Sequence, residues 1–417
     1  MKKFICAIMF VLLMSAWLKA DVLPTVQVRA SSRANGNVLE RYAVNGSGVV
    51  NSESHESFPV QKMWLAQHYL PISDAWLECD LGQICDISLM RIYNFNDKWS
   101  QIDSTENGVH NFQILLSNDG VNYQAFGGIR TANKAPGIPE DQSAPRDNRC
   151  ATNFDLTGAK ARFVKIDIID SYEDPEKAII VGLSEVVFQG QYTGKGQNIA
   201  SDDITVTASS TVNGYDPVNV INGGGFITDG YGAHTWTDPS AGDGNNGWVG
   251  YFDNGQVSLT FEFDEPKDIA AVRLWNLDSW WTGQGNAAIK DFDILASTNG
   301  ITFYNVLTGQ LNPIANSTEY DYSQSFALST GDVKALKLVI NSAHYVNNQT
   351  SGFNEIQFIE TYNIDEELHY DLPGFAQLAS SWLCTPDQQY YVEKWDLIDD
   401  DVIDINDLAI FCGSWLE

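Results

Sequence analysis

The stretch Trp76–Asp97, WLECDLGQICDISLMRIYNFND, returns later in the chain as Leu259–Asp278, LTFEFDEPKDIAAVRLWNLD. At one constant offset the two stretches share five identical residues: Leu77, Asp86, Ile87, Arg91 and Asn94 in the first, and Leu259, Asp268, Ile269, Arg273 and Asn276 in the second. Chance does not keep five identities in register, so the chain contains a duplication.

The duplication extends well beyond these two stretches. Three further pairs of similar segments keep the same order: VQVRASS from Val26 with ITVTASS from Ile204, NFQILLSNDGVNY from Asn111 with DFDILASTNGITF from Asp291, and GLSEVVF from Gly182 with GFNEIQF from Gly352. Solenoid repeats run about 20 to 50 residues, so a unit of this length is a whole domain. A chain of 417 residues has room for two such domains and a smaller third one.

Both copies alternate apolar and polar residues, as in SLMRIYNF and VRLWNLD, with Asn-Gly or Asp-Gly turn signals between the segments. A period of two predicts antiparallel strands, and several such strands at regular spacing predict a sandwich. We therefore predict an all-β fold with two tandem antiparallel β-sandwiches, at residues 26–190 and 199–361. The polar, glycine-containing stretch 191–198 is the predicted linker.

The first twenty residues, 1–20, have the layout of a secretory signal peptide. Lys2 and Lys3 precede an apolar run that ends at Leu18, and Ala20 offers a small residue for cleavage. A retained membrane anchor is the alternative, but the run is shorter than the ~20 residues that a spanning helix needs. We predict a secreted or extracellular protein, in one variant attached to a cell surface, without a membrane span after signal cleavage.

The net charge indicates which binding partners are disfavoured, and the cysteine count indicates whether all thiols can pair. The chain carries 24 basic and 54 acidic side chains, a formal net charge of −30. Such a charge disfavours nucleic acid as a partner. Signal cleavage would leave an odd number of cysteines, so at least one thiol stays unpaired in a monomer. The cysteines that remain after cleavage are Cys79, Cys85, Cys150, Cys384 and Cys412. Two of the cysteines in the first copy are expected in loops.

The sequence contains no recognisable catalytic motif. H-E-x-x-H, G-x-S-x-G, a phosphate-binding loop and C-x-x-C are all missing from it. Paired carboxylates hydrolyse glycosides in many enzymes, but with so many acidic residues such pairs arise by chance. We predict that the protein is not an enzyme.

The ordered motifs WLECDLG, ISLMRIYN, GVHNFQILLSNDGVNY and VGLSEVVF resemble the discoidin domain, also called the coagulation factor five/eight type C domain. Its bacterial members include the family 32 carbohydrate-binding modules. The resemblance covers both predicted sandwiches. It implies a jelly-roll, galactose-binding-like fold that presents its ligand, most often a sugar in bacterial members, at loops on one end.

Aromatic side chains in loops are the candidates for sugar contact, because they stack on the apolar face of a pyranose. Two adjacent tryptophans, Trp280 and Trp281, follow a strand and cannot both face inward. The further candidates in predicted loops are His344 and Tyr345 in the second copy, and Trp99 and His110 in the first. Core packing is the preferred interpretation for five tryptophans in or beside strand-like segments: Trp64, Trp76, Trp236, Trp248 and Trp275.

The resemblance also implies a structural calcium ion, for which oxygen ligands are suited. The implied ligands are Asn222, Asp229, Thr235 and Glu355 in the second copy, but only Asn45 and Glu185 in the first. The intervening segment of the first copy departs from the family pattern. The alternative, favoured for the first copy, is that these polar residues only cap turns.

Residues 363–417 change character and form the third predicted unit, a small α-helical module with 13 acidic residues against one lysine. FAQLASSWL from Phe375 returns as LAIFCGSWL from Leu408. A twelve-residue calcium loop ahead of the second copy would use Asp396, Asp400, Asp404 and Asp407. A merely solvated acidic turn is the alternative.

This tail resembles a degenerate dockerin, the small module that docks secreted proteins onto cohesin partners. The resemblance implies a cohesin-like or cell-surface protein as partner. A pseudo-twofold arrangement of the two similar units would bring Cys384 towards Cys412, so a bridge between these two cysteines is favoured. Together the features favour a secreted, non-catalytic protein that binds carbohydrate or polysaccharide, with the tail as an attachment module. The alternative is a cell-surface adhesion or assembly protein that recognises protein partners through the same loops.

Overall fold

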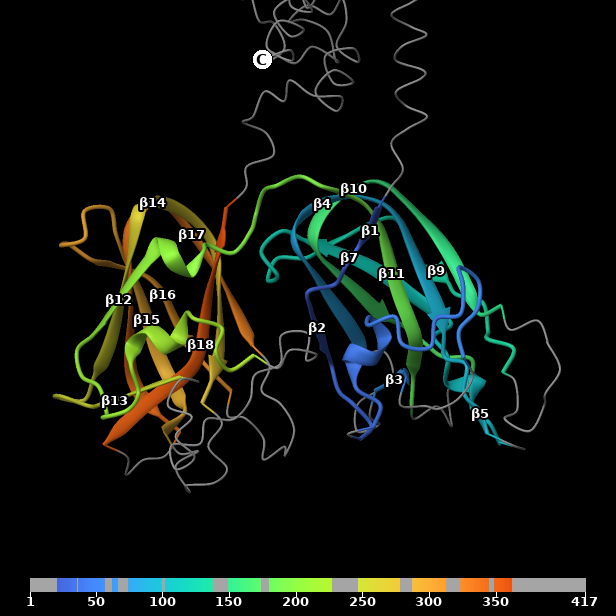
Figure 1. Cartoon of the computed structure of the whole chain (residues 1–417), viewed down its shortest axis with the longest axis horizontal. Coiled ribbons are helices and arrows are strands. Elements are labelled where there is room, and N and C mark those ends of the chain that lie inside the picture. The colour runs from blue at the N-terminus through green and yellow to red at the C-terminus, as the bar shows by residue number, and fades with distance from the viewer. Residues whose placement is uncertain are drawn as a thin grey trace, which may run out of the picture. The chain divides into compact units, whose positions relative to one another are not determined.

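The computed structural model describes residues 21–35, 37–56, 62–66, 74–99, 102–137, 149–173, 180–226, 247–277, 287–312, 323–344 and 349–361. These residues form two antiparallel β-sandwiches (Figure 1), both within one compact unit that spans Met1–Thr361. The all-β prediction is confirmed, while the predicted helical module 363–417 and the signal peptide lie outside the described residues. Within those ranges, no helix has the length and apolar character needed to cross a membrane.

Strands β1 to β4 and β7 to β11 build the first sandwich, β5 and β6 form a separate two-stranded sheet, and β12 to β18 build the second sandwich. The first set is β1 (Asp21–Leu23), β2 (Gln27–Ala30), β3 (Trp64–Leu65), β4 (Trp76–Asn94), β5 (Lys98–Trp99), β6 (Ile102–Asp103), β7 (Asn111–Ser117), β8 (Gln124–Ala125), β9 (Arg130–Thr131), β10 (Ala151–Ile168) and β11 (Gly182–Tyr192). The second set is β12 (Ile204–Ala208), β13 (Trp248–Tyr251), β14 (Val257–Asn276), β15 (Ile289–Ser297), β16 (Tyr304–Gln310), β17 (Gln324–Ala343) and β18 (Thr350–Glu360). Short 3-10 helices lie at Glu40–Ala43, Thr105–Asn107, Ser201–Asp203 and Pro217–Val220.

Strand β4 gives the first sandwich its two layers. Its first part pairs with β2 and with the end of β10, and its last part pairs with β11 and with the beginning of β10. Between the two parts lies Gly82, whose φ of +80° suits glycine best. The register of β10 shifts opposite this point. Strand β4 therefore passes from one layer to the other, and both of its ends lie at the same end of the sandwich.

Strand β14 repeats this arrangement in the second sandwich. Its first part pairs with β12, its last part with β18, and β17 runs beside both parts. In each sandwich, apolar side chains from both layers meet in one core. Leu77, Phe112 and Phe188 belong to the first core, and Leu259 and Phe292 to the second.

The tryptophans test the core prediction. Trp64, Trp248 and Trp275 are completely buried, as predicted. Trp76 is only half-buried and lies on the outer face of β4, because it alternates with the core residue Leu77; its assignment to the core was wrong. Trp236 lies outside the described residues.

The cysteines of the first sandwich are buried and free. Cys79 and Cys85 lie in β4 rather than in loops, which corrects the sequence expectation, and Cys150 lies just before β10. Burial raises the pKa of Cys150 to about 11 and that of Cys85 to about 12. These thiols are therefore protonated packing groups and poor nucleophiles.

Candidate functional site

The residues that the sequence singles out gather at one end of each sandwich, where β4 or β14 both begins and ends. We call it the loop end. It holds Asn45, His110 and Glu185 in the first sandwich, and Asn222, His344 and Glu355 in the second. Strand pairing brings these positions together, although they are far apart in the sequence.

A buried asparagine shapes each loop end. Asn94 ends β4, and its Nδ2 donates to the carbonyl oxygens of Val109 at 2.7 Å and Asn133 at 2.8 Å. Its counterpart in the duplication, Asn276, donates in the same way to Ile289 at 2.9 Å. Both asparagines are at most 1% exposed. This repeated residue therefore holds the loops in place.

His110 lies in a partly exposed polar group at the first loop end. Its Nδ1 lies 3.1 Å from Oδ1 of Asp170, and both side chains are more than a third exposed. The ring of Tyr172 lies 4.5 Å from the imidazole, centroid to centroid. The Tyr172 hydroxyl donates to the backbone carbonyl of Ala132, which fixes the ring.

Asp170 and Tyr172 were missed by the sequence reasoning. They reach His110 because β7 and β10 pair with Phe112 opposite Ile168, a register that cannot be read from either segment alone. The group offers a carboxylate, an imidazole and an aromatic edge to solvent. These are the polar and apolar partners that sugar recognition needs.

Asp97 is a second acceptor that was missed, close to the predicted residue Trp99. Burial raises the pKa of its carboxyl group, and none of the described residues donates a hydrogen bond to its Oδ1. The neighbouring Asn96 is instead fully used, because it donates to His55 and accepts from Gly137. Trp99 lies in β5, but its side chain is outside the described part of the structure.

Glu355 is the centre of the calcium site implied in the second sandwich. It is 2% exposed, and its Oε1 accepts from the Gly223 amide at 3.3 Å, whereas within the described ranges Oε2 has no partner. Burial raises its pKa to about 8. A cavity of about 230 Å³ adjoins it, lined also by Asn222 and Phe226.

A cation fits this environment, because it would satisfy the unpaired oxygen and stabilise the ionised carboxylate. Asn222 caps a turn by accepting from the Gly224 amide at 2.6 Å. Asp229 and Thr235 lie outside the described residues. Within the described ranges no three His, Cys, Asp or Glu side chains converge, so a complete ligand set would require residues beyond them, backbone carbonyls or water.

The first sandwich has a matching site around Glu185. This carboxylate is 1% exposed, and both of its oxygens accept from the Gly46 amide at 3.1 Å. Burial raises its pKa to about 8 as well. Asn45 caps a turn by accepting from the amide of Ser47, whose buried hydroxyl finds no partner among the described residues.

His55 distinguishes the first site from the second. Its ring is completely buried, and its two nitrogens face the carbonyl oxygens of Glu56 at 2.8 Å and Ser47 at 3.1 Å. Gly48 makes room for the ring, since a Cβ there would lie 2.5 Å from it. The histidine thus holds this loop together, in a segment where the sequence of the first copy differs from that of the second.

The remaining candidates are placed only in part. His344 follows β17, and its Nε2 donates to the Leu311 carbonyl at 2.8 Å, which leaves Nδ1 as an acceptor. Five predicted residues or groups lie outside the described residues: Trp280, Trp281, Tyr345, the acidic loop Asp396, Asp400, Asp404 and Asp407, and the cysteines Cys384 and Cys412.

Comparisons with known proteins give structural similarities only. No protein-family model matches the chain, and no curated protein matches it. A fucolectin from striped bass serum, Morone saxatilis, is 14% identical, with a TM-score of 0.30, covering 82% of this chain and 99% of its own. The family 32 carbohydrate-binding module of Clostridium perfringens NanJ, solved with galactose, is 14% identical, with a TM-score of 0.29, covering 39% of this chain and 98% of its own.

A fucose-binding module from Streptococcus pneumoniae is 17% identical, with a TM-score of 0.28, covering 41% of this chain and 96% of its own. TM-scores this low carry no argument about function or family. The assignment of two antiparallel sandwiches rests on the strand pairing described above.

Proposed function

We propose that this chain is a secreted, non-catalytic protein that binds carbohydrate at the loop ends of its sandwiches. The partly exposed group of His110, Asp170 and Tyr172 is the observation that carries the proposal. The carboxylate and imidazole offer hydrogen-bond partners to sugar hydroxyls, and the aromatic ring offers an apolar surface beside them. Single sites of this kind bind weakly, and two sites in one chain gain from a high effective concentration.

Calcium has a structural part in this proposal. Glu355 and Asn222, with Asp229 and Thr235, would hold the ion in the second sandwich, and Glu185 with Asn45 would hold one in the first. The ion would neutralise a carboxylate that burial otherwise keeps protonated. Its expected effect is to stiffen the loops around the ligand.

The two ends of the chain complete the proposal. Residues 1–20 would direct export, and the acidic residues 363–417 would attach the protein to a cohesin-like or cell-surface partner. The support is the sequence pattern at each end.

Retention of the full-length mature chain on immobilised polysaccharides tests the proposal. His110→Ala should weaken binding at least about tenfold, a loss of about 1.4 kcal/mol. Asn122→Ala is the control, because Asn122 is exposed in the turn after β7, at the opposite end of the same sandwich. Binding that His110→Ala leaves intact would contradict the assigned site. A protein partner retained in the presence of free sugar, without polysaccharide binding, would favour the adhesion alternative.

A further inference from the structure

Two acidic side chains of the first sandwich are buried although they point away from its core. Leu77 and Cys79 of β4 belong to the core, and Glu78 and Asp80 alternate with them, so these carboxylates lie on the outer face of the sheet. Each is only 2% exposed. A charge removed from water is costly unless it is paired. The first sandwich supplies most of the partners of these two carboxylates, and the second sandwich supplies one more, Arg273.

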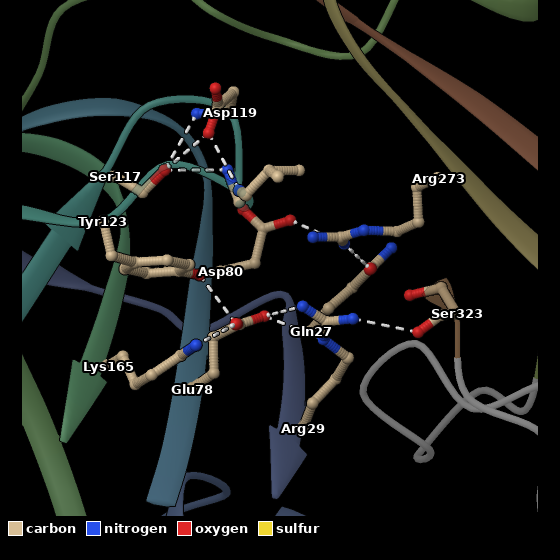
Figure 2. Close-up of polar contacts among 12 residues, drawn as sticks. Gln27, Arg29, Glu78, Asp80, Ser117, Asp119, Tyr123, Lys165, Arg273 and Ser323 are labelled. Carbon is tan, nitrogen blue, oxygen red and sulfur yellow. Dashed lines mark hydrogen bonds and ion pairs between the residues drawn. The ribbon is translucent and has the colours of Figure 1, made fainter. Parts of the chain in front are cut away.

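Asp80 accepts hydrogen bonds from two arginines, one from each sandwich. Arg162 of β10 places Nε 2.9 Å from Oδ1 and Nη2 3.0 Å from Oδ2. Arg273 of β14 places its Nη1 3.0 Å from Oδ2 (Figure 2). Burial opposes ionisation of Asp80, but the two guanidinium groups outweigh it and lower the pKa. Asp80 therefore stays charged and links the sandwiches.

Glu78 anchors a second connection beside the first. It accepts from Arg29 Nε at 2.8 Å and from the Tyr123 hydroxyl at 2.6 Å. Arg29 also donates through Nη1 to the Ser323 carbonyl of the second sandwich at 2.9 Å (Figure 2). One guanidinium thus satisfies a carboxylate in its own sandwich and a backbone oxygen in the other.

Apolar contacts accompany these polar ones. Phe163 and Val121 of the first sandwich cluster with Ala271 and Ile359 of the second. The duplication provides a comparison, because Ile301 stands in the second sandwich where Val121 stands in the first, and it is 83% exposed. The residue that follows the glycine of this turn is apolar in both copies, but it is partly buried only in the first.

The charged positions show the same contrast. Glu262 stands where Asp80 stands, and it is exposed; Arg91 stands where Arg273 stands, and it is only partly buried. The low exposure of Asp80 and Arg273 is therefore not a property of these strand positions. It arises from the contact between the two copies.

The connection between the sandwiches is also held by hydrogen bonds. Arg162 donates to the Gly196 carbonyl and to the Asn198 side chain, each at 2.8 Å. The Ile84 amide donates to the Lys195 carbonyl at 2.8 Å. β11 itself extends to Tyr192, into the predicted linker. The segment between the sandwiches is thus bound to the first sandwich over much of its length.

We propose that the Asp80–Arg273 contact and the apolar cluster beside it lock the two sandwiches into one rigid body. The loop ends then stand in a fixed relation, so the spacing of binding sites is set by the fold and not by a flexible linker. This last consequence rests on the proposed carbohydrate binding, whereas the rigid body itself does not.

Trypsin cleavage after Lys195 tests the lock in the full-length mature chain. Arg273→Met removes the bonds that Arg273 makes to Asp80 and Gln27 but leaves Asp80 paired with Arg162, so the first sandwich should keep its fold. Cleavage should accelerate at least about tenfold over wild type, equivalent to about 1.4 kcal/mol of lost coupling. Arg91→Met is the matched control, at the equivalent position of the other copy, and should cleave at the wild-type rate.

A second pair of variants tests the same contact independently, in case Arg273→Met accelerates cleavage only because it misfolds. Val121→Asp places a charge in the covered turn, and Ile301→Asp places the same charge in the exposed turn of the other copy. Val121→Asp should accelerate cleavage and split the calorimetric unfolding of the two sandwiches into two transitions; Ile301→Asp should do neither. Equal cleavage in all four variants, with wild type already unfolding in two independent transitions, would overturn the lock.

Polysaccharide binding separates this inference from the proposed function. With the lock broken, binding of a small sugar should be unchanged while retention on a polysaccharide falls. If the chain binds no carbohydrate at all, the proposed function fails, and the cleavage rates still decide the lock.

Discussion

At the scale of single residues, the burial of the Glu355 and Glu185 carboxylates predicts how the stability of the protein depends on pH. Burial raises each pKa from 4.5 to about 8, so between these values the folded protein binds more protons than the unfolded chain. Without a metal ion, stability should therefore fall as pH rises from about 4.5 to 8, by up to a few kcal/mol for each group. Denaturant unfolding in EDTA across this range measures the slope.

Added calcium and the substitution Glu355→Gln are the controls for this pH dependence of stability. A bound cation favours the ionised carboxylate, so millimolar calcium should flatten the pH dependence and raise stability at pH 8. Glu355→Gln should remove part of the slope in EDTA and reduce the stabilisation by calcium. A calcium effect unchanged in Glu355→Gln would place the ion elsewhere.

Single residues also differ in whether their position could be predicted from the sequence. Burial of Trp64, Trp248 and Trp275 could be predicted, because each lies in or beside a strand-like segment. The neighbours Asp170 and Tyr172 could not, because they reach His110 through a strand register that no local pattern encodes.

At the scale of secondary-structure elements, the change of layer in β4 depends on Gly82. Gly82→Ala should destabilise the first sandwich by about 1–2 kcal/mol, from the positive φ together with a Cβ only 3.2 Å from Val26. Gly158 is the control: its φ is +90°, and nothing lies within 4 Å of a Cβ there. Gly158→Ala should show only the backbone cost. Equal losses in the two variants, by chemical denaturation, would mean that packing against Val26 adds nothing.

The strands themselves could be predicted from sequence more completely than their pairing. Alternation and turn residues indicate strands such as β7 and β15 because each is a local pattern. The continuous strands β4 and β14 contain the repeated motif, yet their passage between layers depends on register shifts in partner strands. Those shifts come from long-range packing and leave no local signal.

At the scale of the whole molecule, the contact between sandwiches could not be predicted. Glu78 and Asp80 are polar residues at outward positions of a strand, which indicates solvent exposure unless another domain covers them. The sequence likewise indicates a polar linker at residues 191–198, but it does not show that the backbone there bonds to the first sandwich. Duplication reveals two similar domains but not the surface through which they meet.

Burial of these charges predicts how the contact responds to salt. Exposed ion pairs weaken as salt shortens the Debye length from about 10 Å at 0.1 M to 3 Å at 1 M, but buried pairs are screened much less. Raising salt over this range should therefore not accelerate cleavage after Lys195 relative to a short peptide substrate. Accelerated cleavage would indicate that the sandwiches are held by exposed charges.

Binding of the full-length mature chain to a broad glycan array, in calcium and again in EDTA, tests the central claim most directly. The proposal predicts retention on a defined class of glycan, competition by the free sugar, and weaker binding in EDTA. Absence of binding to any glycan in both conditions, by a chain whose unfolding transition shows that it is folded, would contradict the proposed function.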